Sequence, residues 1–587
     1  MGLYYHIDMN GGPNNDRWVN NTTIPKLREQ FNLAYRTGID DLWIVNVGDL
    51  KPKEIPIDFI MRYAWDPDMI AAEDTDAYMT EWAAQNFGDK YATDIADIIS
   101  QYTKYNLWRK AEVQTPGVFS VSNHREADRV DALWKGLEAK AETIRKVLPA
   151  GLDDAYYQLV YYPTVASSGV ARIYNAITRN RHYAYQGRPS ANDWSEVAKE
   201  LFERDKRLSA YYNDTLANGK WKRMMSDVHI GYVKWSMPKE NKLPKMKKVA
   251  MDEAPLMGGS VEGNDFADNW NENLTLPMFD FMLDQTYYID VFNRGNGSFK
   301  CSAKVNKPWI VLKAVENSRK GQQAISTEVD GEKRIWVAVD WNKVNDRNVN
   351  GIVELEGGGK TIRVAVNAFK CDMPNIKGAF FGNLSGSEFS IPADKYDKNI
   401  AGSNASWTVF PDLGRGGACM GVELTGKTKD KNAGNPAVLE YRMLLPEKNE
   451  VTLCIGILPT QDIQPERGLR LAVALDDGEP VVLDARQGFY DEFREYTPEN
   501  LALSKNLKPL PKVENGIKLL GFGQPKRNEV FDNMRWLTTR FKVKEAGLHT
   551  LKLIMVDPEV VLERIVVNPD NNHPSYFGAP ERQFLLK

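Results

Sequence analysis

The spacing of apolar and polar positions changes twice along this chain. Short apolar runs alternate with amphipathic helical patterns at the start, a helical period continues through the next part, and short strands with a period of two fill the second half. We therefore divide the chain into five segments: 1–68, 69–235, 236–275, 276–384 and 385–587.

The first segment predicts two strands, each followed by a helix. Residues 3–8 and 42–47 are apolar runs typical of strands. A helix begins near Thr23 with Pro25 in its first turn, and Pro56 introduces another. A continuous apolar run such as 42–47 is typical of a parallel strand that is covered on both faces. This order predicts a parallel βαβα unit.

Two parallel strands need neighbours, because a sheet of two strands leaves apolar faces and backbone groups open to water. No later segment supplies further parallel strands, since residues 69–587 have the patterns of helices and then of antiparallel strands. We therefore expect residues 1–68 to be the C-terminal end of a larger α/β domain whose first part is absent from this chain. In a (β/α)8 barrel of about 250 residues, two such units would be roughly the last quarter.

The middle of the chain predicts a helical bundle and then a linker. Apolar residues recur at helical spacing in four stretches of the second segment, 91–102, 130–148, 156–180 and 194–216. Residues 236–275 contain several prolines and a Gly-Gly pair, which favours an extended linker.

The second half predicts two antiparallel β-sandwich domains, 276–384 and 385–587, the latter resembling a carbohydrate-binding module. The run Gly357–Lys360 superficially resembles a phosphate-binding loop. The first glycine of that motif would fall on Glu354, however, and the run joins two strands. We interpret it as a hairpin turn.

Charge and composition exclude several classes of function. The 75 Lys and Arg residues nearly balance the 79 Asp and Glu residues, so a nucleic-acid or membrane-surface role has little electrostatic support. No stretch approaches the roughly 20 apolar residues of a membrane span, and no export signal is recognisable in the given sequence.

Cysteine and histidine spacing favours neither metal sites nor a disulfide scaffold. The four cysteines lie far apart without a CxxC pair, and we expect buried free thiols at Cys301, Cys371, Cys419 and Cys454. No H-E-x-x-H motif is present. We expect no metal and no cofactor.

Candidate chemistry gathers at the two strand ends. A period of two places Tyr4, His6 and Asp8 on one face, and in a barrel the inward face near the C-terminal end meets the substrate. Asn46 lies inside an apolar run, where an unpaired amide would cost about 1–3 kcal/mol. Either His6 and Asn46 satisfy each other, or they bind substrate. Asp49 follows in the next loop, where it fixes the turn or touches substrate.

Several stretches resemble glycoside hydrolase family 115, the xylan α-glucuronidases. The likeness spans nearly the whole chain and is most specific in DLWIVNVGDLKPKEIPIDFIMRYAWDP (41–67). It is also carried by YYHIDMNGGP (4–13), RWVN (17–20), MMSDVHIGYVKWSMP (224–238), DVFNRG (290–295), PWI (308–310), AVDW (338–341), GLRLAVALDDG (468–478), HTLKLIMVDPEVVLERIVV (549–567) and SYFGAPE (575–581).

This resemblance implies a barrel, a helical bundle and a C-terminal β region, in that order. It also implies removal of (4-O-methyl-)glucuronic acid from glucuronoxylan by inverting hydrolysis, which uses two carboxylic groups roughly 6.5–9.5 Å apart. The resemblance places those carboxylates on barrel strands upstream of Met1. We therefore assign no catalytic residue here and expect the chain alone to be inactive.

The resemblance further implies that His6 and Asn46 bind substrate. A tyrosine of the family's pocket corresponds to Met9, which lacks the hydroxyl group and the flat ring but can pack against a sugar. Asp8 and Asp49 are supporting residues. The loop residues 14–16 differ from the more basic form associated with the family.

Beyond the site, the resemblance implies an intact protein that is secreted or periplasmic and forms a homodimer. His229 matches a family position, where it is either a structural histidine between bundle and linker or a support for the site. The main alternative function is a carbohydrate-binding or scaffold protein with exposed aromatic residues such as Trp309, Trp341 or Trp407. A nucleotide-binding oxidoreductase is disfavoured, because the parallel unit lacks a G-x-G-x-x-G turn.

Overall fold

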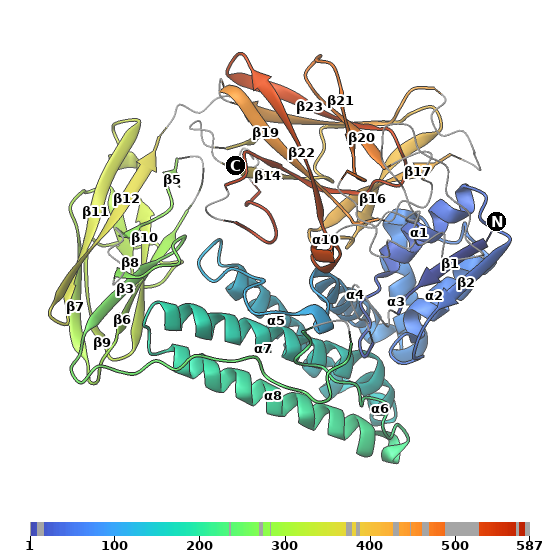
Figure 1. The fold of residues 1–587 in the computed structure, drawn as a ribbon, viewed down its shortest axis with the longest axis horizontal. Coiled ribbons are helices and arrows are strands. Elements are labelled where there is room, and N and C mark those ends of the chain that lie inside the picture. The colour runs from blue at the N-terminus through green and yellow to red at the C-terminus, as the bar shows by residue number, and fades with distance from the viewer. Residues whose placement is uncertain are drawn as a thin grey trace, which may run out of the picture.

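The computed structural model describes most of the chain, in the ranges 2–8, 17–233, 236–268, 274–281, 283, 285–370, 378–382, 388–425, 434–445, 448–460, 469–487, 527–570 and 574–581. A small α/β unit and a β unit stand at opposite ends of a layer of long helices, and a further β unit lies over that layer (Figure 1). No described helix combines the length and apolar composition needed to cross a membrane.

The first unit consists of β1 (Gly2–His6), α1 (Ile24–Arg36), β2 (Leu42–Asn46) and α2 (Glu54–Trp65). The strands pair in parallel, from Gly2 opposite Leu42 to His6 opposite Asn46, which confirms the predicted pairing. One face packs on α1, where the Phe31 ring lies 5.1 Å from Tyr5 and 5.0 Å from Trp43.

The opposite face of the strand pair is open among the described residues. Tyr4, Leu42 and Ile44 are 63%, 58% and 51% exposed. Within the described part of the chain, one face of the run 42–47 is therefore uncovered, although its composition is typical of a strand covered on both faces. No third strand pairs with β1 or β2 in that part. That the two strands belong to a barrel stays a prediction.

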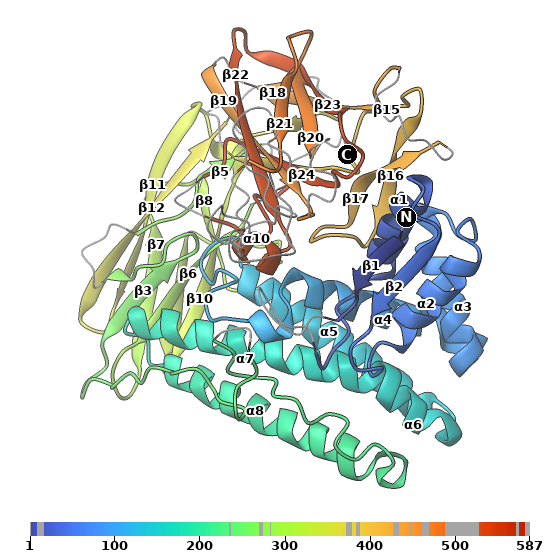
Figure 2. The ribbon, with the colours of Figure 1, turned by 45° about the vertical axis from the view of Figure 1, so that its right-hand side comes forward.

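The long helices bury the predicted stripes. Ile95, Ile99 and Tyr102 are buried on one helix, and Val130 and Trp134 on another. Figures 1 and 2 show the last two long helices, α7 and α8, side by side along the molecule. The helices are α3 (Thr75–Phe87), α4 (Ala92–Trp108), α5 (Glu126–Val147), α6 (Asp153–Tyr156), a π-helix (Tyr157–Tyr161), α7 (Tyr162–Tyr185) and α8 (Ala191–Asp214). Short 3-10 turns lie at Ala72–Asp74, Asp89–Tyr91, Ala111–Val113, Ala150–Leu152, Leu216–Gly219 and Trp341–Lys343.

The predicted linker 236–275 contains a buried strand, β3 (Met257–Val261), which pairs antiparallel with β6. The sequence pattern takes Gly258 and Gly259 as signs of an extended linker. In the structure Gly258 instead leaves room for the ring of Phe292, since a Cβ at Gly258 would lie 2.4 Å from that ring. The linker prediction is therefore wrong over β3, where packing against Phe292 requires Gly258.

The first β unit has a four-stranded sheet in the order β3-β6-β10-β8 and a six-stranded sheet in the order β4-β12-β11-β7-β9, with β5 beside β12. Its pairs are antiparallel, except that β4 and β5 run parallel to β12. The predicted hairpin is confirmed, with Gly357 opposite Lys360. The strands are β4 (Leu274–Thr275), β5 (Phe279–Asp280), β6 (Tyr287–Asn293), β7 (Phe299–Val305), β8 (Ile310–Lys313), β9 (Ala324–Val329), β10 (Glu332–Val339), β11 (Asn348–Gly357) and β12 (Lys360–Phe369).

The second β unit has sheets in the orders β13-β18-β23-β20-β21 and β16-β17-β24-β19-β22, with β15 beside β18 and β14 beside β24. Its first strand, β13 (Phe380–Phe381), lies before the predicted boundary at 384, which is therefore too late. The remaining elements are β14 (Phe389–Pro392), β15 (Lys398–Ile400), β16 (Ala405–Pro411), β17 (Ala418–Leu424), β18 (Val438–Leu445), β19 (Lys448–Ile457), β20 (Arg470–Leu475), β21 (Val481–Asp484), α10 (Arg527–Phe531), β22 (Arg535–Val543), β23 (Gly547–Met555) and β24 (Leu562–Val567).

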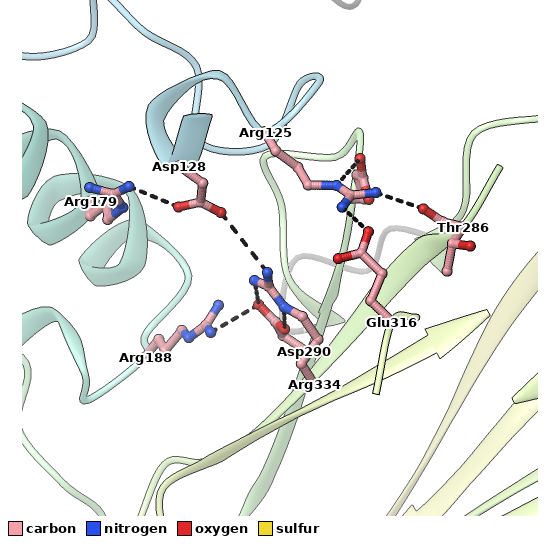
Figure 3. Close-up of polar contacts among 9 residues, drawn as sticks. Arg125, Asp128, Arg179, Arg188, Thr286, Asp290, Glu316 and Arg334 are labelled. Carbon is pink, nitrogen blue, oxygen red and sulfur yellow. Dashed lines mark hydrogen bonds and ion pairs between the residues drawn. The ribbon is translucent and has the colours of Figure 1, made fainter. Parts of the chain in front are cut away.

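Buried ion pairs fix the helices on the first β unit (Figure 3). Asp290 on β6 accepts from Arg188, which follows α7, at 2.9 Å and from Arg334 on β10 at 2.7 Å. Burial alone would raise the pKa of Asp290, yet the two guanidinium groups hold that pKa below its usual range. Arg334 also lies 4.0 Å from Asp128 of α5. Charged side chains of β6, β10 and α5, together with Arg188, therefore hold the helices against the first β unit.

Candidate functional site

His6 and Asn46 lie side by side at the carboxyl ends of β1 and β2. The backbone N–H of Gly48 donates to Asn46 Oδ1 at 3.0 Å, so the amide NH2 group faces His6. Asn46 Nδ2 lies 3.2 Å from His6 Nδ1, which is also 3.2 Å from the carbonyl oxygen of Asp8. Nδ1 can accept from the Asn46 amide or, when it carries the proton, donate to the carbonyl of Asp8, so both neighbours hold the ring in place. The ring is exposed, so its Nε2 edge can reach a ligand.

Asp8 and Asp49 have different surroundings. Asp8 is buried, and its carboxylate lies against Gly48. A Cβ at Gly48 would stand 2.0 Å from Asp8 Oδ2, and the φ of Gly48 is +55°, so the close approach requires glycine. Asp49 is exposed in the loop. Asp8 therefore shapes the loop after β2, and Asp49 stays a predicted supporting residue. Met9 and residues 14–16 lie outside the described residues.

The segment after residue 16 ties the strand ends to the helices. Thr22 donates its hydroxyl to the carbonyl of Ile7 at 3.4 Å, next to the strand end. The buried Lys53 ammonium donates to the carbonyl of Val19 at 3.1 Å. Arg17 donates its backbone N–H to Glu112 at 2.9 Å. The strand-end site is thus bordered by the helical layer.

His229 forms a buried pair that the sequence patterns did not predict. Its Nδ1 lies 2.9 and 3.0 Å from the two carboxylate oxygens of Asp205 on α8, and its ring stacks on Trp18 at 3.6 Å. Within the described ranges, the buried Nε2 of His229 has no hydrogen-bond partner. The sequence did contain a hint of Asp205, because this aspartate falls among the apolar positions Ala198, Leu201 and Tyr212 of a helical pattern.

The tryptophans proposed for glycan stacking are core residues or partly buried. Trp309 and Trp407 are 5% and 2% exposed. Trp341 packs edge-on against Phe281 at 5.5 Å. Trp309 and Trp407 therefore cannot present a face to a sugar, because the interleaved side chains of the two sheets in each β unit enclose them.

The expected burial of the cysteine thiols is found for Cys301 and Cys419 but not for Cys454. Cys301, Cys419 and Cys454 are free thiols, with Cys454 partly exposed, and Cys371 lies outside the described residues. Over the described ranges no cluster of three or more His, Cys, Asp or Glu side chains is arranged to hold a metal ion.

Two segments match models of one protein family. Residues 1–113 match glycosyl hydrolase family 115, and residues 387–495 with 523–581 match the glycosyl hydrolase family 115 C-terminal domain. No curated protein matches the chain.

One solved structure shares the fold across the chain. It is described as a novel family GH115 4-O-methyl-alpha-glucuronidase, BtGH115A, with specificity for decorated arabinogalactans. It aligns with a TM-score of 0.55 and 17% identity over 97% of this chain and 51% of that one. This chain thus spans about half the length of that relative, and at this identity the likeness shows the fold alone.

Two carbohydrate-binding modules align with part of the chain at TM-scores too low to support a common fold. The C-terminal CBM6 of LamC from Zobellia galactanivorans aligns at 0.18 with 13% identity, over 31% of this chain and 98% of that one. A family 35 module from Clostridium thermocellum also aligns at 0.18, with 9% identity over the same shares.

Both ends of the chain thus match glycosyl hydrolase family 115, and the chain shares the fold of a solved member of that family.

Proposed function

We propose that this chain carries the sugar-binding strand ends of an α-glucuronidase, a glycoside hydrolase that removes (4-O-methyl-)glucuronic acid from glucuronoxylan by inversion. The observation that carries the proposal is the pairing of His6 and Asn46 at the ends of parallel strands. The family matches at both ends of the chain support the class of enzyme.

In this proposal His6 and Asn46 orient the sugar. Gly48 fixes the direction of the Asn46 amide, and that amide and the carbonyl of Asp8 hold the His6 ring. The exposed Nε2 of His6 then forms a hydrogen bond with a hydroxyl group of the uronic acid. Met9 packs against the sugar ring, and Asp8 holds the loop after β2.

In this proposal the catalytic acid and base of the hydrolysis are not assigned to residues of this chain. Inverting hydrolysis needs two carboxylic groups roughly 6.5–9.5 Å apart, one to protonate the leaving oxygen and one to activate water. Near the strand ends the described carboxylates include Asp8, which is buried against Gly48, and the exposed Asp49. We assign neither role to them and propose that both groups come from outside this chain, so that the chain alone binds but does not hydrolyse.

A binding experiment tests the sugar site. The purified chain is titrated with an aldouronic oligosaccharide from glucuronoxylan in a calorimeter, and a decorated arabinogalactan oligosaccharide serves as the comparison glycan. Asn46→Ala should weaken binding about tenfold or more, since an oriented amide donor is lost. Asn350→Ala is the matched control and should bind unchanged, because Asn350 lies on β11, and β11 stands at the other end of the helical layer from β1 and β2 (Figure 1). Equal affinity of Asn46→Ala and the original chain would refute the site, and preference for the arabinogalactan would refute the xylan assignment.

We also propose that the intact protein is exported and dimeric, on the resemblance alone. Light scattering after gel filtration of the intact protein would give twice the monomer mass, and a monomer mass would contradict the dimer.

A further inference from the structure

A small pocket on the surface of the helices is lined by arginines and tyrosines. Its volume is about 240 Å³, and its described lining contains Arg145, Arg204 and Arg207 but no carboxylate. Leu208 is the apolar member, and the tyrosines are Tyr157, Tyr161 and Tyr211. Pocket residues come from α5, the π-helix and α8, and the pocket is therefore separate from the strand ends.

The arginines keep donors for a ligand. Arg145 uses Nε and Nη2 on Asp153, at 2.8 and 3.1 Å, which leaves Nη1 outside that pair. Arg204 reaches Glu138 through Nη1 at 3.0 Å, which leaves Nε and Nη2. Arg207 is exposed and has no hydrogen bond or ion pair within the described part of the chain. Arg145 and Arg204 are thus paired with carboxylates, whereas Arg207 is not. An unpaired guanidinium favours an anion whose two oxygens can accept from its fork of N–H groups.

The tyrosines are placed by an unusual backbone. Tyr157–Tyr161 forms a π-helix between α6 and α7, and such segments occur mostly as short insertions, frequently at functional sites. The ring of Tyr157 lies 5.4 Å from that of Tyr161 and 4.7 Å from that of Tyr211. The guanidinium of Arg145 lies 4.7 and 4.8 Å from the first two rings. The pocket therefore combines flat apolar rings with fixed positive charge.

We propose that this pocket binds a single carboxylated sugar residue of an acidic glycan. The carboxylate accepts from Arg207 and from the open edges of Arg145 and Arg204, and the C–H face of the sugar lies on a tyrosine ring. The pocket is smaller than the roughly 300–1,000 Å³ of pockets for drug-sized ligands, so it suits one sugar ring and excludes a whole nucleotide. This second site does not depend on the function proposed for the strand ends.

The π-helix also contacts the loop region after β2. Gln158 donates to Glu54 at 2.8 Å, and Glu54 in turn pairs with Lys51 at 2.5 Å. The elements that carry the two sugar sites thus touch each other.

Ligand-observed NMR titration with D-glucuronate tests this site, with D-glucose and inorganic phosphate as comparison probes. Glucuronate should bind more tightly than either, and Arg207→Ala should weaken it about tenfold, as for the loss of one charge-assisted hydrogen bond. Arg207→Lys, which keeps the charge, should retain part of the affinity. Arg319→Ala, at an exposed arginine of the first β unit, should bind as the original chain does.

The strand-end variant Asn46→Ala separates the two sites. Glucuronate binding that survives in Asn46→Ala and weakens in Arg207→Ala supports the pocket, whatever happens to hydrolysis or xylan binding. Binding that is lost in Asn46→Ala and unchanged in Arg207→Ala would overturn the pocket proposal. So would phosphate or glucose binding as tight as glucuronate, or no binding of glucuronate at all.

Discussion

The strand-end site depends on a glycine as much as on its polar side chains. Gly48 donates the hydrogen bond that orients Asn46, and it has no side chain where the carboxylate of Asp8 lies. The polar pair, the buried acid and the turn therefore form one unit, in which a change at Gly48 alters all of the others.

Substitution of Gly48 should show this dependence. Gly48→Ala places a Cβ 2.0 Å from Asp8 Oδ2 at a φ of +55°, and we expect it to lower the free energy of unfolding by about 1–3 kcal/mol. Urea denaturation of both proteins measures the change. Gly38→Ala is the matched control, because Gly38 also has a positive φ, +82°, but no atom lies within 4 Å of the place that its Cβ would occupy. If Gly48→Ala lowers the free energy of unfolding no more than Gly38→Ala does, the close approach of Gly48 to Asp8 does not contribute to stability.

The buried pair of His229 and Asp205 gives a second expectation at this scale. Asp205→Ala leaves the buried Nδ1 of His229 without its acceptor, which should cost about 1–3 kcal/mol of unfolding free energy at pH 8. Asp205→Asn keeps an acceptor oxygen and should cost less. Equal losses for the two variants, compared by urea denaturation, would argue against the hydrogen bond as the cause.

Local periodicity could predict the strand-end residues but not the buried pair. A period of two identified His6, and a polar residue in an apolar run identified Asn46. Asp205 precedes His229 by 24 residues on another element, so their contact depends on how α8 packs and no local spacing reports it. The alternative of exposed stacking tryptophans is wrong for Trp309 and Trp407 for a related reason, since residue type alone does not tell whether a ring faces the core.

The elements pack together through charges that the hydrophobic pattern does not report. Glu262, in the turn after β3, receives Arg125 Nε at 3.0 Å, and Arg125 also pairs with Glu316. Figure 3 shows Arg125 reaching toward the first β unit. Burial raises the pKa of Glu262 to about 7 in spite of Arg125, in keeping with its buried Oε2, which has no partner within the described residues.

This raised pKa predicts a pH dependence. Between about pH 4.5 and 7 the folded chain keeps the proton on Glu262 while the unfolded chain loses it, so this carboxyl contributes stability at low pH that is lost as the pH rises. The contribution is about 3 kcal/mol at most. Glu262→Gln removes it, so the unfolding free energy of the original chain minus that of the variant should be larger at pH 5 than at pH 8. A difference that is constant or larger at pH 8 would contradict this assignment.

Elements with strong local signals were predictable, and those made by packing were not. Pro25 and Gly38 lie close to the two ends of α1, as predicted. The glycines before Lys360 likewise predict the hairpin. β3 was not predictable, because Gly258 is needed for the close approach of Phe292, whereas a glycine pair among prolines is also typical of a linker.

At the scale of the whole molecule, the sequence predicts the order of α/β, helical and β parts but not the surroundings of each. α1 packs on the second β unit, where the buried Arg28 pairs with Glu423 nearly 400 positions later. The face of β1 and β2 with Tyr4, Leu42 and Ile44 is open among the described residues, although the run 42–47 has the composition of a covered strand. Exposed apolar patches on soluble proteins commonly mark interaction surfaces.

In the function that we propose, this chain supplies sugar-binding strand ends without the acid and base of hydrolysis. The decisive experiment is to incubate the purified 587-residue chain with glucuronoxylan and to measure released glucuronic acid by anion-exchange chromatography. We expect no release above the level of the substrate alone, from a chain that still binds the aldouronic oligosaccharide. Steady release of glucuronic acid by the chain on its own would contradict the proposal.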